Sequence, residues 1–230
     1  MKNKIKSTCY MCDQPSTSRE HVPPRALFPE KKHTPDGKDY RLSLIVVPSC
    51  DLHNSAKSAD DEYMMQMLPM ALGLNDVAED HFNGKVQRSV LRNTKLLDAL
   101  KASAIHVNVH DTVTDTWEQT MAMTIDLERI HGGLEMNARG IYFHHRGVKL
   151  DGPINVKTNF SVVMEIPEIN DSIDAVFRMA DEMLKDAPRH GSNPEVFYYR
   201  IDREGDIELM EFTFYGTSKA LFSIFHQPSL

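Results

Sequence analysis

The spacing of apolar residues changes along this chain and predicts an alternation of strands and helices. Residues 42–47 (LSLIVV) form a short β-rich run bounded by Pro48, which is typical of a strand. From Ser55 onward, apolar residues recur every three or four positions, which predicts a helix that Pro69 should end or kink. The same spacing predicts a second, long helix over residues 77–104.

The second half of the chain mixes helical spacing with alternating apolar and polar runs. Gly132 and Gly133 weaken one of the expected helices, because glycine is a poor helix former. A turn over residues 203–206 is expected to join two strands into a hairpin. This mixture predicts an α+β fold. The expected helices are 125–145 and 173–184, and the expected strands are 105–113, 117–124, 160–166, 196–201, 207–214 and 220–225.

The length of 230 residues allows one or two domains, since about 150 residues per domain is a reasonable prior. We expect an N-terminal unit (1–60) and a second unit (61–230), with a helix able to run across the boundary. A hydrophobic content of 41% is ordinary for a globular protein. No apolar run approaches the roughly 18 residues of a membrane span. Residues 1–6 are basic and polar with no apolar stretch behind them, so we expect a cytoplasmic protein.

Charge is distributed unevenly along the chain. The formal net charge is −7, yet residues 1–57 contain ten Lys and Arg against six Asp and Glu, a net +4. The remaining residues contain 16 basic and 27 acidic side chains, a net −11. A basic N-terminal segment is enough to contact phosphates. The acidic remainder would repel a nucleic-acid duplex, or would face a partner protein.

Three cysteines in the first quarter of the chain predict a metal site. Cys9 and Cys12 form a C-x-x-C pair, and Cys50 and His53 form a C-x-x-H pair. An odd cysteine count in a reducing compartment argues against a disulfide framework. Three thiolates and one imidazole match the ligands of tetrahedral Zn²⁺, so we predict a structural zinc knuckle that stabilises this segment. The alternative is that two cysteines are incidental and that His53 lies on the surface.

Two further motifs lie beside these ligands. Glu20 and His21 begin the sequence E-H-V-P-P between the two pairs, and Asn54 follows His53 within C-x-x-H-N-x-x-K. The order C-x-x-C, E-H-V-x-P and C-x-x-[C/H]-N-x-x-K resembles the HNH (ββα-metal) endonuclease superfamily, over about residues 7–62. In that superfamily a β-hairpin carries the histidine and the following helix carries the last motif residue. The resemblance therefore implies an N-terminal ββα-metal module braced by the zinc knuckle, followed by a helical segment and a C-terminal α+β domain.

The resemblance also implies a role for each motif residue. His21 would be the general base that activates water for attack on a phosphodiester, since the pKa of imidazole lies near working pH. Glu20 and Asn54 would bind one catalytic Mg²⁺ or Mn²⁺, which would neutralise the scissile phosphate. Three cations near the motif would contact the nucleic-acid backbone: Lys57, Arg19 and Arg25.

The chain departs from the superfamily pattern at one position. The middle Asn normally lies on the strand before the second knuckle, but residues 43–47 contain no Asn. Ser43 or a main-chain carbonyl would have to orient His21 in its place. Catalytic activity is therefore implied less strongly than the fold.

These features predict a metal-dependent endonuclease that hydrolyses DNA. Family analogy places such small nucleases in phage defence or phage DNA processing. Residues 61–230 would then supply specificity, homodimerisation or partner docking. Two alternatives stay open. One is a zinc-knuckle module that binds nucleic acid or protein without cutting. The other is an effector nuclease that a partner protein activates through the acidic part of the chain.

Overall fold

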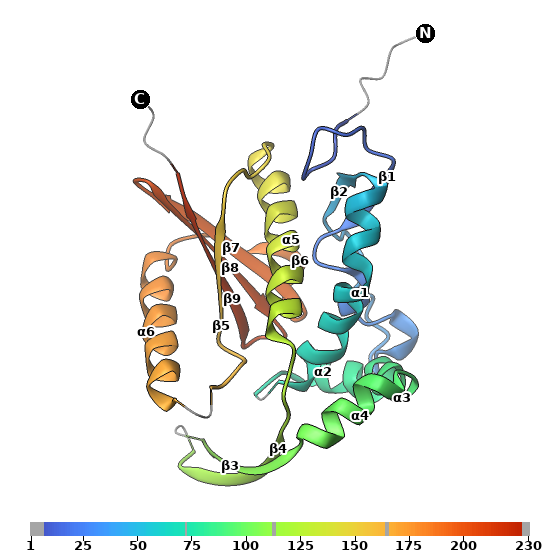
Figure 1. The fold of residues 1–230 in the computed structure, drawn as a ribbon, viewed down its shortest axis with the longest axis vertical. Helices are drawn as coiled ribbons and strands as arrows, with labels where there is room; N and C mark the ends of the chain where they lie inside the picture. Colours follow the sequence, from blue (N-terminus) through green and yellow to red (C-terminus); the bar gives the residue numbers. More distant parts are fainter. Residues whose placement is uncertain (1–6, 72, 112–113, 164–165, 227–230) are drawn as a thin grey trace.

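A short antiparallel hairpin at the N-terminal end leads directly into a long helix. β1 (Ser18–His21) pairs with β2 (Val46–Ser49), and α1 (Asp51–Met67) begins just after Cys50. The predicted strand and helix thus both exist. The strand lies further along the chain than 42–47, and the helix begins at Asp51 rather than Ser55. Two 3-10 turns lie between the strands: η1 (Arg25–Leu27) and η2 (Lys31–His33). The computed structural model (Figure 1) describes residues 7–71, 73–111, 114–163 and 166–226.

Several short helices follow α1, where a single long helix was predicted. The prediction of one helix over 77–104 is wrong, because Asn93 leaves helical backbone geometry (φ −89°, ψ 81°). Its side chain accepts a hydrogen bond from Leu96 N and caps a new helix. At Pro69, α1 gives way to a 3-10 turn as predicted. The elements are η3 (Leu68–Met70), α2 (Asp76–His81), the π-helical turn η4 (Phe82–Val86), α3 (Gln87–Arg92) and α4 (Thr94–Ser103).

The rest of the chain is α+β, as predicted. A two-stranded hairpin precedes the central helix, and a five-stranded antiparallel sheet has the order β5-β9-β8-β7-β6. The predicted hairpin around residues 203–206 is confirmed. The elements are β3 (Ile105–Asp111), β4 (Thr116–Ala122), α5 (Leu127–Arg146), β5 (Ile154–Thr158), α6 (Pro167–Met183), β6 (His190–Asn193), β7 (Phe197–Glu204), β8 (Ile207–Phe214) and β9 (Ser218–Phe225).

The strand predicted at 160–166 is wrong. The strand that joins the sheet is β5, which pairs with β9, whereas residues 160–163 have no regular structure. Their backbone is bonded to a helix instead: Asn170 of α6 accepts from Val163 N and donates to Val163 O, both at 2.9 Å. Residues 164–165, like 112–113 of another predicted strand, lie outside the described residues.

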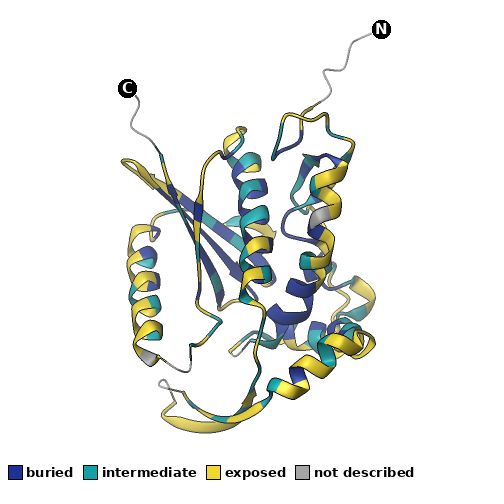
Figure 2. Cartoon of the chain, in the orientation of Figure 1, coloured by how far each residue is buried: buried dark blue, intermediate teal, exposed yellow. Residues whose placement is uncertain are grey.

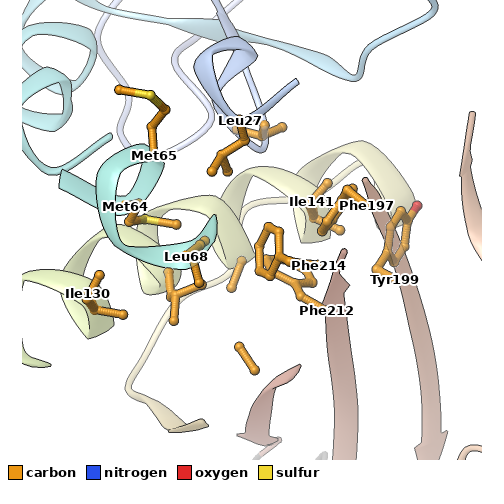
Figure 3. Packing of buried hydrophobic residues seen from close by; sticks show 14 of the residues in the cluster. Leu27, Met64, Met65, Leu68, Ile130, Ile141, Phe197, Tyr199, Phe212 and Phe214 are labelled. Atoms are coloured by element: carbon orange, nitrogen blue, oxygen red, sulfur yellow. The ribbon is translucent and has the colours of Figure 1, made fainter. Parts of the chain in front are cut away.

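Four layers pack on one another, in the order α6, five-stranded sheet, α5 and α1. α6 covers one face of the sheet, while α5 covers the other and packs against α1 (Figure 1). One cluster of buried side chains extends from Cys9 through α1 and α5 to Phe222 of β9, so residues on both sides of position 60 share it. Figure 3 shows its centre, where side chains of α1, α5 and the sheet meet. A smaller cluster that includes Phe177 and Leu221 lies between α6 and the sheet.

Two glycines allow α5 to lie close to Val22 and to α1. A Cβ at Gly140 would lie 2.6 Å from Val22 Cγ1, and a Cβ at Gly133 would lie 2.5 Å from Met64 Sδ. Both distances are shorter than a real Cβ contact, so a side chain at Gly140 would displace the branched Val22, and one at Gly133 would displace the flexible end of Met64. Gly132, by contrast, faces open space. The expected weakening of this helix is outweighed by packing, because α5 runs unbroken through all three positions.

The outer surfaces of these layers are exposed (Figure 2). α6 alternates buried and exposed positions, with Ala180 buried against the sheet and Met179 66% exposed. None of the described helices combines the length and the apolar character that crossing a membrane requires.

Candidate metal centre and adjoining cavity

The three cysteines and His53 converge at the N-terminal end of α1. Their ligand atoms all lie within 4.8 Å of one another. His53 Nδ1 lies 3.4 Å from Cys9 Sγ, 3.6 Å from Cys12 Sγ and 3.3 Å from Cys50 Sγ, and the Cys12 and Cys50 sulfurs are 3.8 Å apart. A tetrahedral zinc with sulfur and nitrogen ligands has ligand–ligand edges of roughly 3.5–3.8 Å. The Cys3His cluster therefore suggests a structural Zn²⁺.

Local backbone geometry brings these ligands together. Cys50 is the N-cap of α1, so Cys50 and His53 belong to the same first helical turn. The turn that carries Cys9 and Cys12 is attached to the hairpin by a hydrogen bond from Tyr10 N to Pro48 O at 2.9 Å. Burial opposes ionisation of Cys9, but backbone donors led by Met11 N outweigh it and lower the pKa of this thiol to about 7. A thiolate is the form that binds a metal.

A cavity of about 440 Å³ lies between the N-terminal unit and the helices that follow α1. Its lining includes Glu20 and His21 of β1 and Asn54 of α1, so the structure brings the three predicted catalytic residues to one cavity. The predicted backbone-contacting Arg19 and Arg25 line it as well. Further lining residues come from η4 and α3, beyond position 60: Lys85 and Ser89.

His21 is half-buried at the end of β1, where its backbone pairs with Val46. Burial and the nearby Arg25 and Arg41 lower the pKa of His21 below its ordinary value. Within the described part of the chain, its ring makes no hydrogen bond, so neither Ser43 nor a main-chain carbonyl replaces the missing Asn. The imidazole is thus neutral at neutral pH and free to accept a proton.

Glu20 is buried and bonded to Lys57. Lys57 Nζ donates to Glu20 Oε1 at 2.5 Å and to Asn137 Oδ1 of α5 at 2.7 Å. The side chain of Lys57 is 1% exposed. The expected phosphate contact of Lys57 is not compatible with this burial, because its ammonium faces the carboxylate and α5 and not the solvent. The other carboxylate oxygen, Glu20 Oε2, is buried and has no hydrogen-bond partner among the described residues.

Asn54 is exposed on the first turns of α1. Its Nδ2 donates to Ser18 Oγ at 3.2 Å, which holds the amide against β1. No hydrogen bond to its Oδ1 occurs within the described residues. Glu20 Oε2 and Asn54 Oδ1 are therefore two oxygen atoms without donors that belong to residues of one cavity.

Asp61 is a cavity residue that the motif did not include. Asn54, Ser58 and Asp61 occupy positions i, i+4 and i+7 of α1, so they share one helix face and all line the cavity. Burial raises the pKa of Asp61 to about 6, despite an ion pair with Lys57 at 3.6 Å. Asp61 was not identified from the sequence, although its i+7 spacing from Asn54 is a signal that could have found it.

Comparisons of the chain with protein family models, with curated proteins and with solved structures find no match. Function is therefore inferred from the geometry of the site.

Proposed function

We propose that the protein is a metal-dependent endonuclease of the HNH type that hydrolyses phosphodiester bonds in DNA. The observation that carries the proposal is the cavity shared by His21, Glu20 and Asn54, which lies beside a Cys3His cluster on a ββα unit. The Zn²⁺ bound by Cys9, Cys12, Cys50 and His53 would have a structural role, because four protein ligands leave it no open position.

Residues of the cavity fit a second, catalytic cation. Glu20 Oε2 is buried without a partner, and Asn54 presents an amide oxygen. Hard oxygen ligands of this kind suit Mg²⁺ or Mn²⁺. Such a cation, when bound, neutralises charge on the scissile phosphate. Lys57 would act through Glu20, because its ammonium holds Oε1 and leaves Oε2 available.

His21 would accept a proton from a water molecule as the oxygen of that water attacks the phosphorus. The bond from phosphorus to the 3′ oxygen breaks, and this oxygen takes up a proton from solvent. A histidine must be neutral to act as a general base, and it must reach the water. His21 meets both requirements, because its ring is half-buried at the cavity and makes no hydrogen bond within the described chain.

A His21→Ala variant tests the proposal in a Mg²⁺-dependent plasmid cleavage assay. We expect cleavage to fall by at least about 100-fold, the usual contribution of a general base. His144→Ala is the matched control, because His144 is exposed on α5 and does not line the cavity. Equal cleavage by both variants would contradict the assignment of the base.

One observation favours a second candidate, a zinc-knuckle module that binds DNA without cutting it. The ring of His21 lacks the orienting contact that the superfamily's middle Asn provides. Purified parent protein that binds duplex DNA but leaves it intact with Mg²⁺ and with Mn²⁺ would support this candidate over the nuclease.

A further inference from the structure

Three cationic side chains line the cavity without a counter-ion: Arg19, Arg25 and Lys85. Among the described residues, none of them forms an ion pair or a side-chain hydrogen bond. The acidic residues that line the same cavity do not form ion pairs with these cations. Glu20 pairs with Lys57, and Glu62 accepts a hydrogen bond from Ser89 Oγ at 3.3 Å. Asp61 has its ion pair with Lys57. Unpaired cations at one concave surface leave a site for an anion.

Lys85 is the cation that comes from outside the N-terminal unit. It lies in η4, a single π-helical turn between α2 and α3, and it is half-buried. Turns of this kind are rare and occur often at functional sites. Burial and the neighbouring Arg41 and Arg25 lower the pKa of Lys85, whereas Glu30 opposes this. Glu30 itself forms ion pairs with Lys32 at 2.8 Å and with Arg41 at 3.0 Å.

Electrostatic repulsion among these neighbouring cations indicates a negatively charged ligand. Like charges near a partly buried ammonium are unfavourable in the free protein, and a bound anion relieves that repulsion. Lysine and arginine at one concave site are the usual ligands of a phosphodiester oxygen. A small anion and a nucleic-acid backbone share this chemistry, and the adjoining candidate nuclease residues favour the backbone.

We propose that Lys85, together with Arg25, binds a backbone phosphate of the DNA substrate, so that the helical segment after position 60 completes the cleft. The identity of the ligand rests on the proposed function. A phosphate contact was predicted from the sequence for Lys57, but the ammonium of Lys57 is buried. In this proposal, Lys85 makes that contact instead. Its role is to position the substrate and not to take part in the chemical step.

The test measures DNA binding in the absence of cleavage. Full-length, zinc-loaded protein with His21→Ala is titrated against a short fluorescent DNA duplex, between about 50 and 200 mM NaCl. We expect an added Lys85→Gln substitution to weaken binding several-fold and to lower the slope of log K against log salt by about 1, the change for one lost phosphate contact. Lys85→Arg should retain both the affinity and the slope.

Lys95→Gln in the same background is the matched control, because Lys95 is exposed on α4 and does not line the cavity. Equal affinities and slopes for Lys85→Gln and Lys95→Gln would overturn the inference, as would a parent that shows no salt-dependent binding to the duplex. Cleavage by protein with an intact His21 is measured separately. Binding through Lys85 without any cleavage would refute the nuclease and leave the phosphate site standing.

Discussion

Lys57 and Glu20 form a buried ion pair between α1 and β1, with Lys57 Nζ 2.5 Å from Glu20 Oε1 and both side chains almost fully enclosed. The same ammonium donates to Asn137, which comes from α5 and in turn donates to Gly133 O at 2.7 Å. One lysine thus joins the strand that carries the candidate base to the central helix of the fold.

Replacement of Lys57 by Met should destabilise the protein by about 3–5 kcal/mol, because it leaves the Glu20 carboxylate buried without its counter-ion. The measurement is urea unfolding of zinc-loaded protein, followed by circular dichroism. Lys57→Met combined with Glu20→Gln should recover part of the loss, since neither charge then remains. A single variant within about 1 kcal/mol of the parent would contradict a coupled pair.

Loss of the Cys3His cluster should remove one bound zinc per chain. His53→Ala is expected to reduce the zinc content measured by elemental analysis and to lower the melting temperature, since metal binding and folding of such a segment are coupled. His144→Ala should keep both values, because His144 is exposed and far from the cluster in sequence. Unchanged zinc content in the His53 variant would refute the ligand assignment.

Two glycines of α5 should respond to alanine with opposite signs. Gly140→Ala places a Cβ 2.6 Å from Val22 Cγ1, and we expect this overlap to cost about 1–3 kcal/mol of unfolding free energy. Gly132→Ala meets nothing within 4 Å and should stabilise the protein by up to about 1 kcal/mol, through better helix propensity. Denaturant unfolding of the two variants checks the pair. Equal effects would mean that Gly140 of α5 does not pack against Val22.

His81 should make stability depend on pH in the mildly acidic range. Burial lowers the pKa of His81 from 6.5 to about 4, and its Nε2 lies 3.1 Å from Ala26 O. Between pH 6.5 and pH 4, His81 is therefore protonated in the unfolded chain but not in the folded protein. The free energy of unfolding thus decreases as the pH falls from 6.5 toward 4. Between pH 7 and pH 5 this histidine should account for about 2 kcal/mol.

A His81→Gln variant isolates this contribution. Its unfolding free energy should fall less than that of the parent between pH 7 and pH 5, since glutamine does not titrate. His144→Ala should follow the parent, because that side chain is exposed. Parallel pH profiles for the parent and His81→Gln would show that His81 is not held neutral in the folded state.

The metal cluster and several elements could be predicted from local sequence. The two-residue spacings of Cys9 with Cys12 and of Cys50 with His53 each fit a single turn. The four candidate ligands come together when these two turns lie side by side. The hairpin of β7 and β8 followed in the same way from alternating residues on either side of a tight turn. The strand at 160–166 failed because a side chain of α6 binds that backbone in place of the sheet.

The sequence by itself determined the candidate Cys3His ligand set and the α+β character, because these depend on neighbours a few residues apart. Only the tertiary structure decided that Lys57 is buried against Asn137 and that Lys85 reaches the cavity. Residues that are distant along the chain set these environments. Lys57 is buried because β1 and α5 pack on α1, and this tertiary packing cannot be read from local residue spacing.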